Sequence, residues 1–419
     1  MLWFAVTLAI ITYIDRVCIS QAAPHIQSDL GLNKEQMSLV FSAFTLAYAL
    51  FEIPGGWLGD KFGPRSILMK VVTMWSFFTA ATGWAWNMAS LVVCRFLFGA
   101  GEAGCFPNLT KAFTLWMPQG ERVRAQGIMW LSARWGGAFT PLLVAGTMAL
   151  VSWRVTFVIY GAIGVVWAVL FYRWFRDNPR DHPSVNAAEL ALLGDARQNM
   201  GSHLRVPWRK LLSSRTVWML WLQYFCMAYG WDFYITWLPT YLKEQGVTGG
   251  YAAFLAGFPL FFGGLGSLFA GLIAPWLARW LGCRARARRV LAYVGLSGAA
   301  VMLVLATVTR MPLLTAIALG LSSFGNDLAM PGSWGACMDV GGKYSGSLSG
   351  SMNMMGNFGG MVSPVVAAQI LKFTDNNWDI TLWVSAAVYL IGAAAWRFID
   401  PVTPLEAQTK AGDPARAAS

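Results

Sequence analysis

The stretch Gly56-Trp57-Leu58-Gly59-Asp60-Lys61-Phe62-Gly63-Pro64-Arg65 follows one long apolar run and precedes another. Glycines at positions 56 and 63 permit close approach between helices and a tight turn. Asp60 can lie against the positive end of a helix, whereas Lys61 and Arg65 favour the cytosolic side of a membrane. The stretch therefore predicts a short basic turn between two membrane-spanning helices.

The composition of the whole chain agrees with a membrane protein. The 419 residues are 56% hydrophobic and only 12% charged, so a lipid bilayer is the expected surrounding. One span needs about 20 apolar residues. The apolar runs predict an all-α membrane protein with twelve transmembrane helices near 2–22, 36–58, 66–86, 89–115, 122–148, 153–175, 215–241, 252–278, 289–308, 312–336, 344–371 and 379–399.

Basic residues indicate the orientation of these spans. The net charge is +11, but lysines and arginines stand in short clusters between apolar runs, so they are topology signals and no nucleic-acid partner is expected. Most fall in loops on the side of the N-terminus. The opposite loops hold only Lys34, Arg154, Lys243, Arg310 and Lys372. We expect a multi-pass protein of the inner membrane with both termini in the cytoplasm.

The chain divides into two similar halves. Its one long polar connection predicts an N-terminal six-helix bundle (1–175), a cytoplasmic linker (176–214), a C-terminal six-helix bundle (215–399) and a cytoplasmic tail (400–419). Features recur in the same order at an offset of 223 to 225 residues: Glu102 with Asn326, Pro107 with Pro331, Gly136-Gly137 with Gly359-Gly360, and Trp153 with Trp378. The fold is thus predicted as two pseudo-symmetric six-helix bundles.

Several stretches carry a resemblance to a known family. The stretch 56–65 resembles the signature loop of the major facilitator superfamily. Within that superfamily, Tyr13-Ile-Asp15-Arg16, the segment 95–107 and the segment 350–364 resemble the anion:cation symporter family. That family includes symporters of hexuronates, aldonates and aldarates, and relatives that carry sialate, phosphate or glutamate. The resemblance implies a major facilitator fold, transport by alternating access, and a gating role for the 56–65 loop.

The resemblance also implies proton coupling by Asp15 and Glu102, and substrate binding and gating by Arg16 and Arg95. The residues themselves support a site, because a charge at mid-bilayer is costly and normally pairs. Arg95 and Glu102 are seven residues apart, so each needs a partner on another helix, and Arg16 and Asp15 are the obvious ones. A carboxylate that loses its arginine to an arriving anion can take up a proton. The alternative is a network that only holds the helices together.

Histidines are not the expected proton carriers. His25, His182 and His203 all fall in predicted loops. An intramembrane carboxylate is therefore the better candidate for proton coupling.

Arg134 is a third arginine within the spans. It favours a substrate with more negative charge, since a guanidinium matches carboxylate geometry, although pairing with Glu102 or Asp232 is an equal alternative. Other candidates for substrate contact are polar or aromatic residues that also occur in packed cores: Tyr13, Tyr48, Asp232, Tyr234, Trp334, Asn353 and Asn357.

The sequence predicts a transporter and not an enzyme. It shows no nucleophile–base set, no metal-ligand cluster and no cofactor motif in a suitable context, so protons are the only expected coupling partner. We predict a functional monomer that carries a small organic anion by proton symport, with sugar acids such as hexuronates, aldonates or aldarates as the favoured substrates. The alternatives are anion exchange, or transport of aromatic or phosphorylated carboxylates on the same fold.

Overall fold

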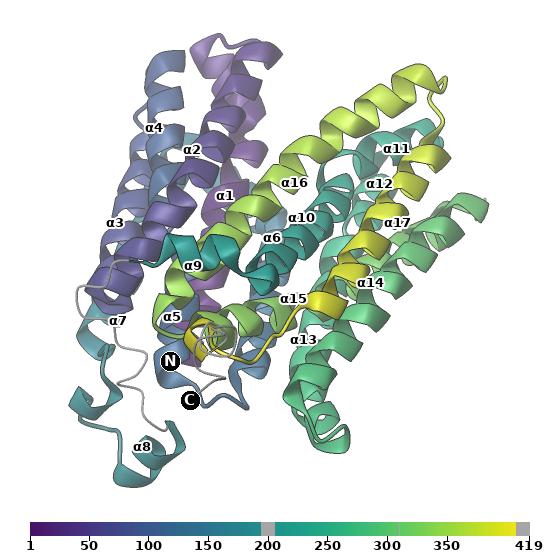
Figure 1. Ribbon diagram of the computed structural model, residues 1–419. Helices are drawn as coiled ribbons and strands as arrows, with labels where there is room; N and C mark the ends of the chain where they lie inside the picture. Colours follow the sequence, from purple (N-terminus) through teal and green to yellow (C-terminus); the bar gives the residue numbers. More distant parts are fainter. Residues whose placement is uncertain (194–205, 310, 408–419) are drawn as a thin grey trace. The chain divides into compact units, whose positions relative to one another are not determined.

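The computed structural model describes residues 1–193, 206–309 and 311–407. These residues form helices and connecting turns without any strand, which confirms the predicted all-α class. Parts of the predicted linker and tail, together with His203 and Arg310, lie outside the described residues. The helices up to the linker are α1 (Leu2–Leu30), α2 (Lys34–Phe62), α3 (Pro64–Thr82), α4 (Met88–Glu102), α5 (Cys105–Trp116), α6 (Arg122–Leu150) and α7 (Trp153–Trp174) (Figure 1).

The remaining helices begin in the predicted linker. They are η1 (Pro179–Asp181), α8 (Ala187–Leu193), α9 (Trp208–Ser213), α10 (Arg215–Thr236), α11 (Leu238–Glu244), α12 (Gly249–Ala256), α13 (Phe258–Trp280), α14 (Arg284–Val308), α15 (Pro312–Gly341), η3 (Gly342–Tyr344), α16 (Ser345–Phe373), α17 (Trp378–Ala395) and η4 (Trp396–Phe398).

All twelve predicted spans fall on helices, but some details differ. The predicted spans 89–115, 215–241 and 252–278 are each divided into two helices, namely α4 and α5, α10 and α11, and α12 and α13. The first helix continues to Leu30, so the prediction that His25 lies in a loop was wrong. Polar residues in this extension hid the continuation, because hydropathy marks the end of an apolar run and not the end of a helix.

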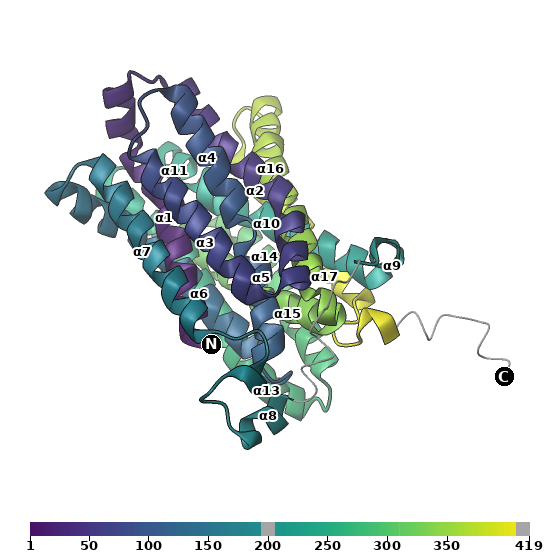
Figure 2. The same cartoon turned by 90° about the vertical axis from the view of Figure 1, so that its left-hand side faces the viewer.

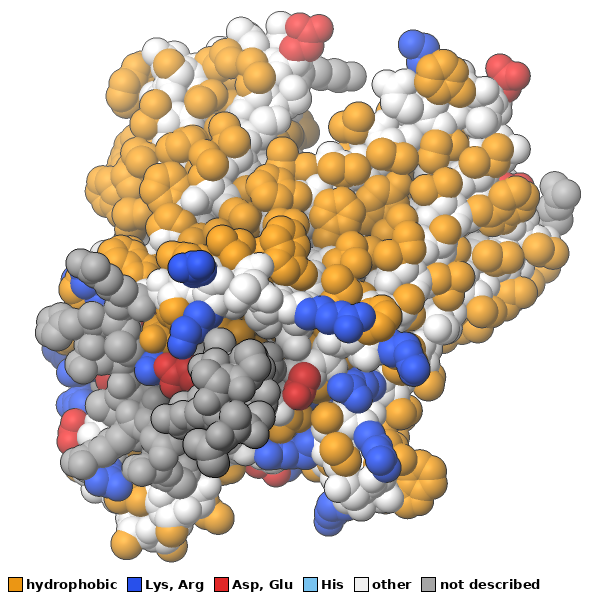
Figure 3. Space-filling model, in the orientation of Figure 1, with side chains coloured by type: hydrophobic (Ala, Val, Ile, Leu, Met, Phe, Trp, Pro, Cys, Tyr) orange, Lys and Arg blue, Asp and Glu red, His pale blue; other side chains and the backbone are white. Residues whose placement is uncertain are grey.

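The described helices have the surface of a membrane protein. Eight stretches are long and apolar enough to cross a bilayer, and one of them, Pro312–Phe373, contains both α15 and α16. Large apolar side chains such as Leu142 and Val294 are 74% and 62% exposed, while many polar and charged side chains are buried. Hydrophobic side chains cover much of the face seen in Figure 3. This is a multi-pass membrane protein.

The chain folds into two compact units. Unit 1 contains residues 1–119, 132–206 and 343–351, and unit 2 contains residues 120–131, 207–342 and 352–419. Consequently α6 begins in unit 2 and continues in unit 1, whereas α16 begins in unit 1 and continues in unit 2. Within unit 1, α3 packs against both α4 and α7 (Figures 1 and 2).

The first glycine of each repeated pair has a matching role in the two units. A Cβ atom on Gly136 would lie 3.2 Å from Ile10 Cα in α1, and one on Gly137 would lie 2.8 Å from the Tyr13 ring. In unit 2, a Cβ atom on Gly359 would collide with the carbonyl of Phe225 in α10. Thus α6 packs closely on α1 as α16 packs on α10, and in each case glycine makes the close approach possible.

Cys283 offers a direct test of the expected orientation. It occupies the N-cap position of α14 and is partly exposed, and the backbone N–H groups of Arg286 and Ala285 lower the pKa of its thiol. We expect a membrane-impermeant maleimide to label it near neutral pH in inside-out vesicles, but weakly in intact cells. Cys283→Ser should abolish this labelling. Equal or stronger labelling of Cys283 in intact cells would contradict cytoplasmic termini.

Candidate functional site

Four charged residues from α1 and α4 lie together inside unit 1. Asp15, Arg95 and Glu102 are only 1%, 2% and 0% exposed, and the Arg16 side chain is 26% exposed. Charges that are this deeply enclosed need counter-charges or hydrogen-bond partners. Their partners therefore show what the cluster can do.

Arg16 and Glu102 form the central contact of the cluster. The Arg16 guanidinium donates to Glu102 Oε1 from Nε at 3.0 Å and from Nη2 at 2.5 Å. The predicted cross-helix partner of Glu102 is thus present. The other oxygen, Oε2, is buried and has no hydrogen-bond partner. Glu102 is also the last residue of α4, so it stands where the long apolar stretch is interrupted before α5 begins at Cys105.

Asp15 and Arg95 interact electrostatically, but the direct partner of Asp15 is another residue. The Asp15 Oδ2 atom accepts a hydrogen bond from Trp75 Nε1 in α3 at 3.1 Å, and its Oδ1 atom is buried without a partner. Adjacent residues of a helix point about 100° apart, so Asp15 and Arg16 face different neighbours. The sequence analysis did not predict Trp75 as a member of this cluster. Only the general rule that a buried indole N–H needs a hydrogen-bond acceptor could have indicated it.

Aromatic rings surround the two guanidinium groups. The Arg95 guanidinium lies 4.3 Å from the Phe98 ring centre and 5.0 Å from that of Phe44, and Arg95 Nε has no hydrogen-bond partner. Arg16 also faces the Phe44 ring, at 5.4 Å. The predicted substrate residues Tyr13 and Tyr48 lie beside Arg16, at 5.4 and 4.7 Å. Phe44 was not predicted, because one phenylalanine in an apolar run carries no distinguishing pattern.

Arg134 is 3% exposed and lies on the part of α6 that packs on α1 in unit 1. Glu102 is not its partner, since Oε1 of that carboxylate binds Arg16 and Oε2 binds nothing. Asp232 lies in unit 2, where its Oδ1 atom accepts a hydrogen bond from Thr236 at 3.1 Å. Glu102 is thus not the hydrogen-bond partner of Arg134, and the alternative of a pair with Asp232 stays a prediction.

The other predicted contact residues lie in unit 2. Tyr234 donates to Ser322 at 2.7 Å, and Trp334 donates to the Tyr224 hydroxyl at 3.1 Å. The Asn357 amide donates to the backbone carbonyl of Asn353 at 3.1 Å. These contacts hold the residues in place, and their roles in substrate binding stay predictions.

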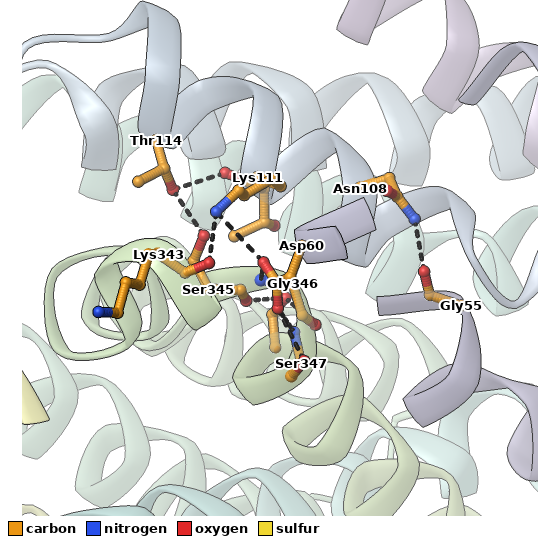
Figure 4. A network of polar contacts seen from close by, with 11 residues as sticks. Gly55, Asp60, Asn108, Lys111, Thr114, Lys343, Ser345, Gly346 and Ser347 are labelled. Carbon is orange, nitrogen blue, oxygen red and sulfur yellow. Dashed lines mark hydrogen bonds and ion pairs between the residues drawn. The ribbon is translucent and has the colours of Figure 1, made fainter. Parts of the chain in front are cut away.

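The 56–65 loop makes the contact that its sequence predicts. Asp60 accepts hydrogen bonds from the backbone N–H groups of Gly346 and Ser347 at 3.0 and 2.6 Å, and from the Ser347 hydroxyl at 2.7 Å (Figure 4). These groups form the first turn of α16, where the positive end of the helix dipole favours an acid. A Cβ atom on Gly56 would collide with the Gly346 carbonyl, which explains the glycine.

Lys111 completes this cluster and was missed by the sequence analysis. Its ammonium lies 3.3 Å from Asp60 Oδ1 and donates to the Lys343 carbonyl at 2.5 Å, with its side chain 2% exposed (Figure 4). A single lysine near the end of an apolar run resembles an interfacial anchor, so nothing in the sequence showed that it turns inward.

The basic residues of the loop serve the turn itself. Gly63 has φ of 81° and separates α2 from α3. The Arg65 backbone N–H donates to Asp177 Oδ1 at 2.9 Å, and its guanidinium donates to the Tyr172 carbonyl. Burial raises the pKa of Asp177, another residue that was missed. The Lys61 ammonium lies over the Trp57 ring at 4.9 Å.

Unit 2 holds a comparable cluster that was not predicted. Arg122, the first residue of α6, donates to Asp339 Oδ1 at 2.5 Å, and Arg288 donates to Asp339 Oδ2 at 2.6 Å. Asp339 thus binds the start of α6 in unit 2, as Asp60 binds the start of α16 in unit 1. Among the described residues, no group of three or more His, Cys, Asp or Glu could hold a metal ion.

Comparisons with known proteins agree with this architecture. The Major Facilitator Superfamily model matches residues 5–364. A probable sulfoacetate transporter of Cupriavidus necator is 39% identical over 411 residues, covering 96% of this chain and 94% of the relative. A probable galactarate/D-glucarate transporter of Escherichia coli K12 is 31% identical, covering 89% and 88%. A solved proton:xylose symporter shares the fold, with a TM-score of 0.76, 13% identity and coverage of 97% and 98%.

The family match spans most of the chain, and the curated relatives of similar length are named as transporters of organic anions. The fold is therefore the predicted one of two six-helix bundles, and enzymatic activity is not its role. The chain belongs to the major facilitator superfamily and is a membrane transporter of small organic anions.

Proposed function

We propose that this transporter couples the uptake of a small organic dianion to protons. The observation that carries the proposal is the enclosed ion pair of Arg16 and Glu102 in unit 1. Two relatives support the charge of the substrate, since sulfoacetate carries a carboxylate and a sulfonate, and galactarate and glucarate carry two carboxylates. Sulfoacetate and aldarates are thus better candidates than the singly charged hexuronates and aldonates.

The coupling step follows from the charges of the cluster. An arriving anionic group competes with Glu102 Oε1 for the Arg16 guanidinium. Glu102 is fully enclosed, so once it loses Arg16 its negative charge is no longer compensated. A proton on Glu102 removes that charge, and its release restores the ion pair after the anion has left. Asp15, which has one unpartnered oxygen, is the candidate for a second proton.

The dianion preference rests on three arginines of unit 1, namely Arg16 and Arg95 in the charged cluster and Arg134, which is 3% exposed on α6. A carboxylate or sulfonate presents acceptor oxygens that match the guanidinium fork. Two acidic groups on one small molecule would engage more than one of these arginines.

We further propose that the Asp60 cluster acts as the gate on the cytoplasmic side during alternating access.

Glu102→Gln tests the coupling. The amide keeps the size of the side chain but cannot exchange a proton, so exchange of labelled anion across proteoliposomes should continue while accumulation driven by an inward proton gradient is lost. Internal anion should then only reach the external concentration. Glu35→Gln, an exposed acid at the start of α2, is the matched control and should accumulate anion normally. Normal gradient-driven accumulation by Glu102→Gln would refute the coupling role.

Arg134→Gln tests the charge of the substrate. Loss of one charge-assisted hydrogen bond costs about 1.5–3 kcal/mol, so the apparent affinity for sulfoacetate or galactarate should fall at least about tenfold. A monoanion such as galactonate should lose much less. Arg124→Gln is the control, since Arg124 is exposed on the same helix and binds only Glu121 at 3.4 Å. An equal loss for monoanions and dianions would argue against the dianion proposal, even if coupling is intact.

A further inference from the structure

The turn between α13 and α14 in unit 2 concentrates positive charge without acidic residues. Five arginines lie within residues 279–289, and the sequence contains no Asp or Glu between Glu244 and Asp327. Two of the five are used internally. Arg288 binds Asp339 and the Pro401 carbonyl, and Arg289 donates to the Ile399 carbonyl. The turn still carries excess positive charge at its surface.

Arg279 and Arg286 supply much of that excess. Both are exposed, and neither guanidinium forms an ion pair or donates a hydrogen bond within the described part of the chain. Arg286 belongs to the first turn of α14, where the helix dipole is also positive. Basic residues are unfavourable at this end of a helix unless an anion lies beside them.

Two tryptophans stand next to these arginines. Trp276 and Trp280 are four residues apart on α13, are 53% and 72% exposed, and stack with their ring centres 6.1 Å apart and an interplanar angle of 4°. Figure 3 shows Lys and Arg side chains gathered over the lower end of α13 and α14, with hydrophobic side chains among them. Exposed tryptophans of this kind favour the boundary between headgroups and acyl chains.

We propose that this turn, through Arg279, Arg286, Trp276 and Trp280, binds the headgroup of an anionic phospholipid from the adjoining leaflet. A phospholipid matches both the arginines and the tryptophans of this turn, since its phosphate pairs with the arginines and its glycerol and upper acyl region cover the indole rings. A soluble anion would satisfy only the arginines. Such lipid binding requires only that the chain is embedded in a membrane, and it is independent of the transported substrate.

Native mass spectrometry of the full chain in detergent tests the site, with phosphatidylglycerol and phosphatidylcholine of identical acyl chains as probes. The wild-type protein should retain phosphatidylglycerol preferentially. Each basic residue near a membrane surface contributes about a factor of five, so Arg279→Gln/Arg286→Gln should weaken phosphatidylglycerol binding about 25-fold and leave phosphatidylcholine binding unchanged. Arg279→Lys/Arg286→Lys keeps the charge and should retain most of the preference.

The matched control removes two exposed arginines elsewhere, Arg180→Gln/Arg209→Gln, and should behave as wild type. Trp276→Leu/Trp280→Leu should weaken phosphatidylglycerol binding, and sn-glycerol 3-phosphate should not displace the lipid. The proposal is overturned if the Arg279/Arg286 glutamine variant elutes as a folded monodisperse protein and keeps its preference. It is also overturned if the control loses as much, or if glycerol 3-phosphate competes fully.

Discussion

The ion pair between Arg16 and Glu102 joins α1 to α4 inside unit 1. Glu102 is fully enclosed, and Arg16 is flanked by the rings of Tyr13, Phe44 and Tyr48. Removing one partner of a buried pair costs about 3–5 kcal/mol, because the remaining charge is left without compensation. In the proposed mechanism, an anion that binds Arg16 therefore arrives together with a group that neutralises Glu102. A proton meets this need without requiring further space.

In each unit, an acidic side chain also binds the start of a long helix. Asp60 binds the first turn of α16 within unit 1, and Asp339 binds Arg122 at the start of α6 within unit 2. Both helices continue into the other unit, so each acid holds a helix that belongs to both units. This reciprocity is the structural counterpart of the sequence repeat, although the acids themselves are not repeat partners.

A side-chain contact was predictable where a local sequence pattern limits which group can be the partner. The loop 56–65 has glycines and an acid at a spacing that suits a helix start, and Asp60 does bind one. The same reasoning missed the direct partner of Asp15, because sequence separation on α4 did not reveal that Trp75 of α3 faces it. Lys111 and Asp339 were missed because an isolated charge in an apolar run does not indicate which helix lies opposite. Burial depends on tertiary packing, which no local pattern contains.

In the proposed mechanism, the anion displaces Glu102 from Arg16 and a proton replaces the lost charge. Calorimetric titration of purified transporter with sulfoacetate or galactarate, in buffers of different ionisation enthalpy, measures the protons taken up per anion bound. We expect net proton uptake by the wild-type protein and a smaller uptake by Glu102→Gln. Tight anion binding by the wild type with no net proton uptake would contradict it.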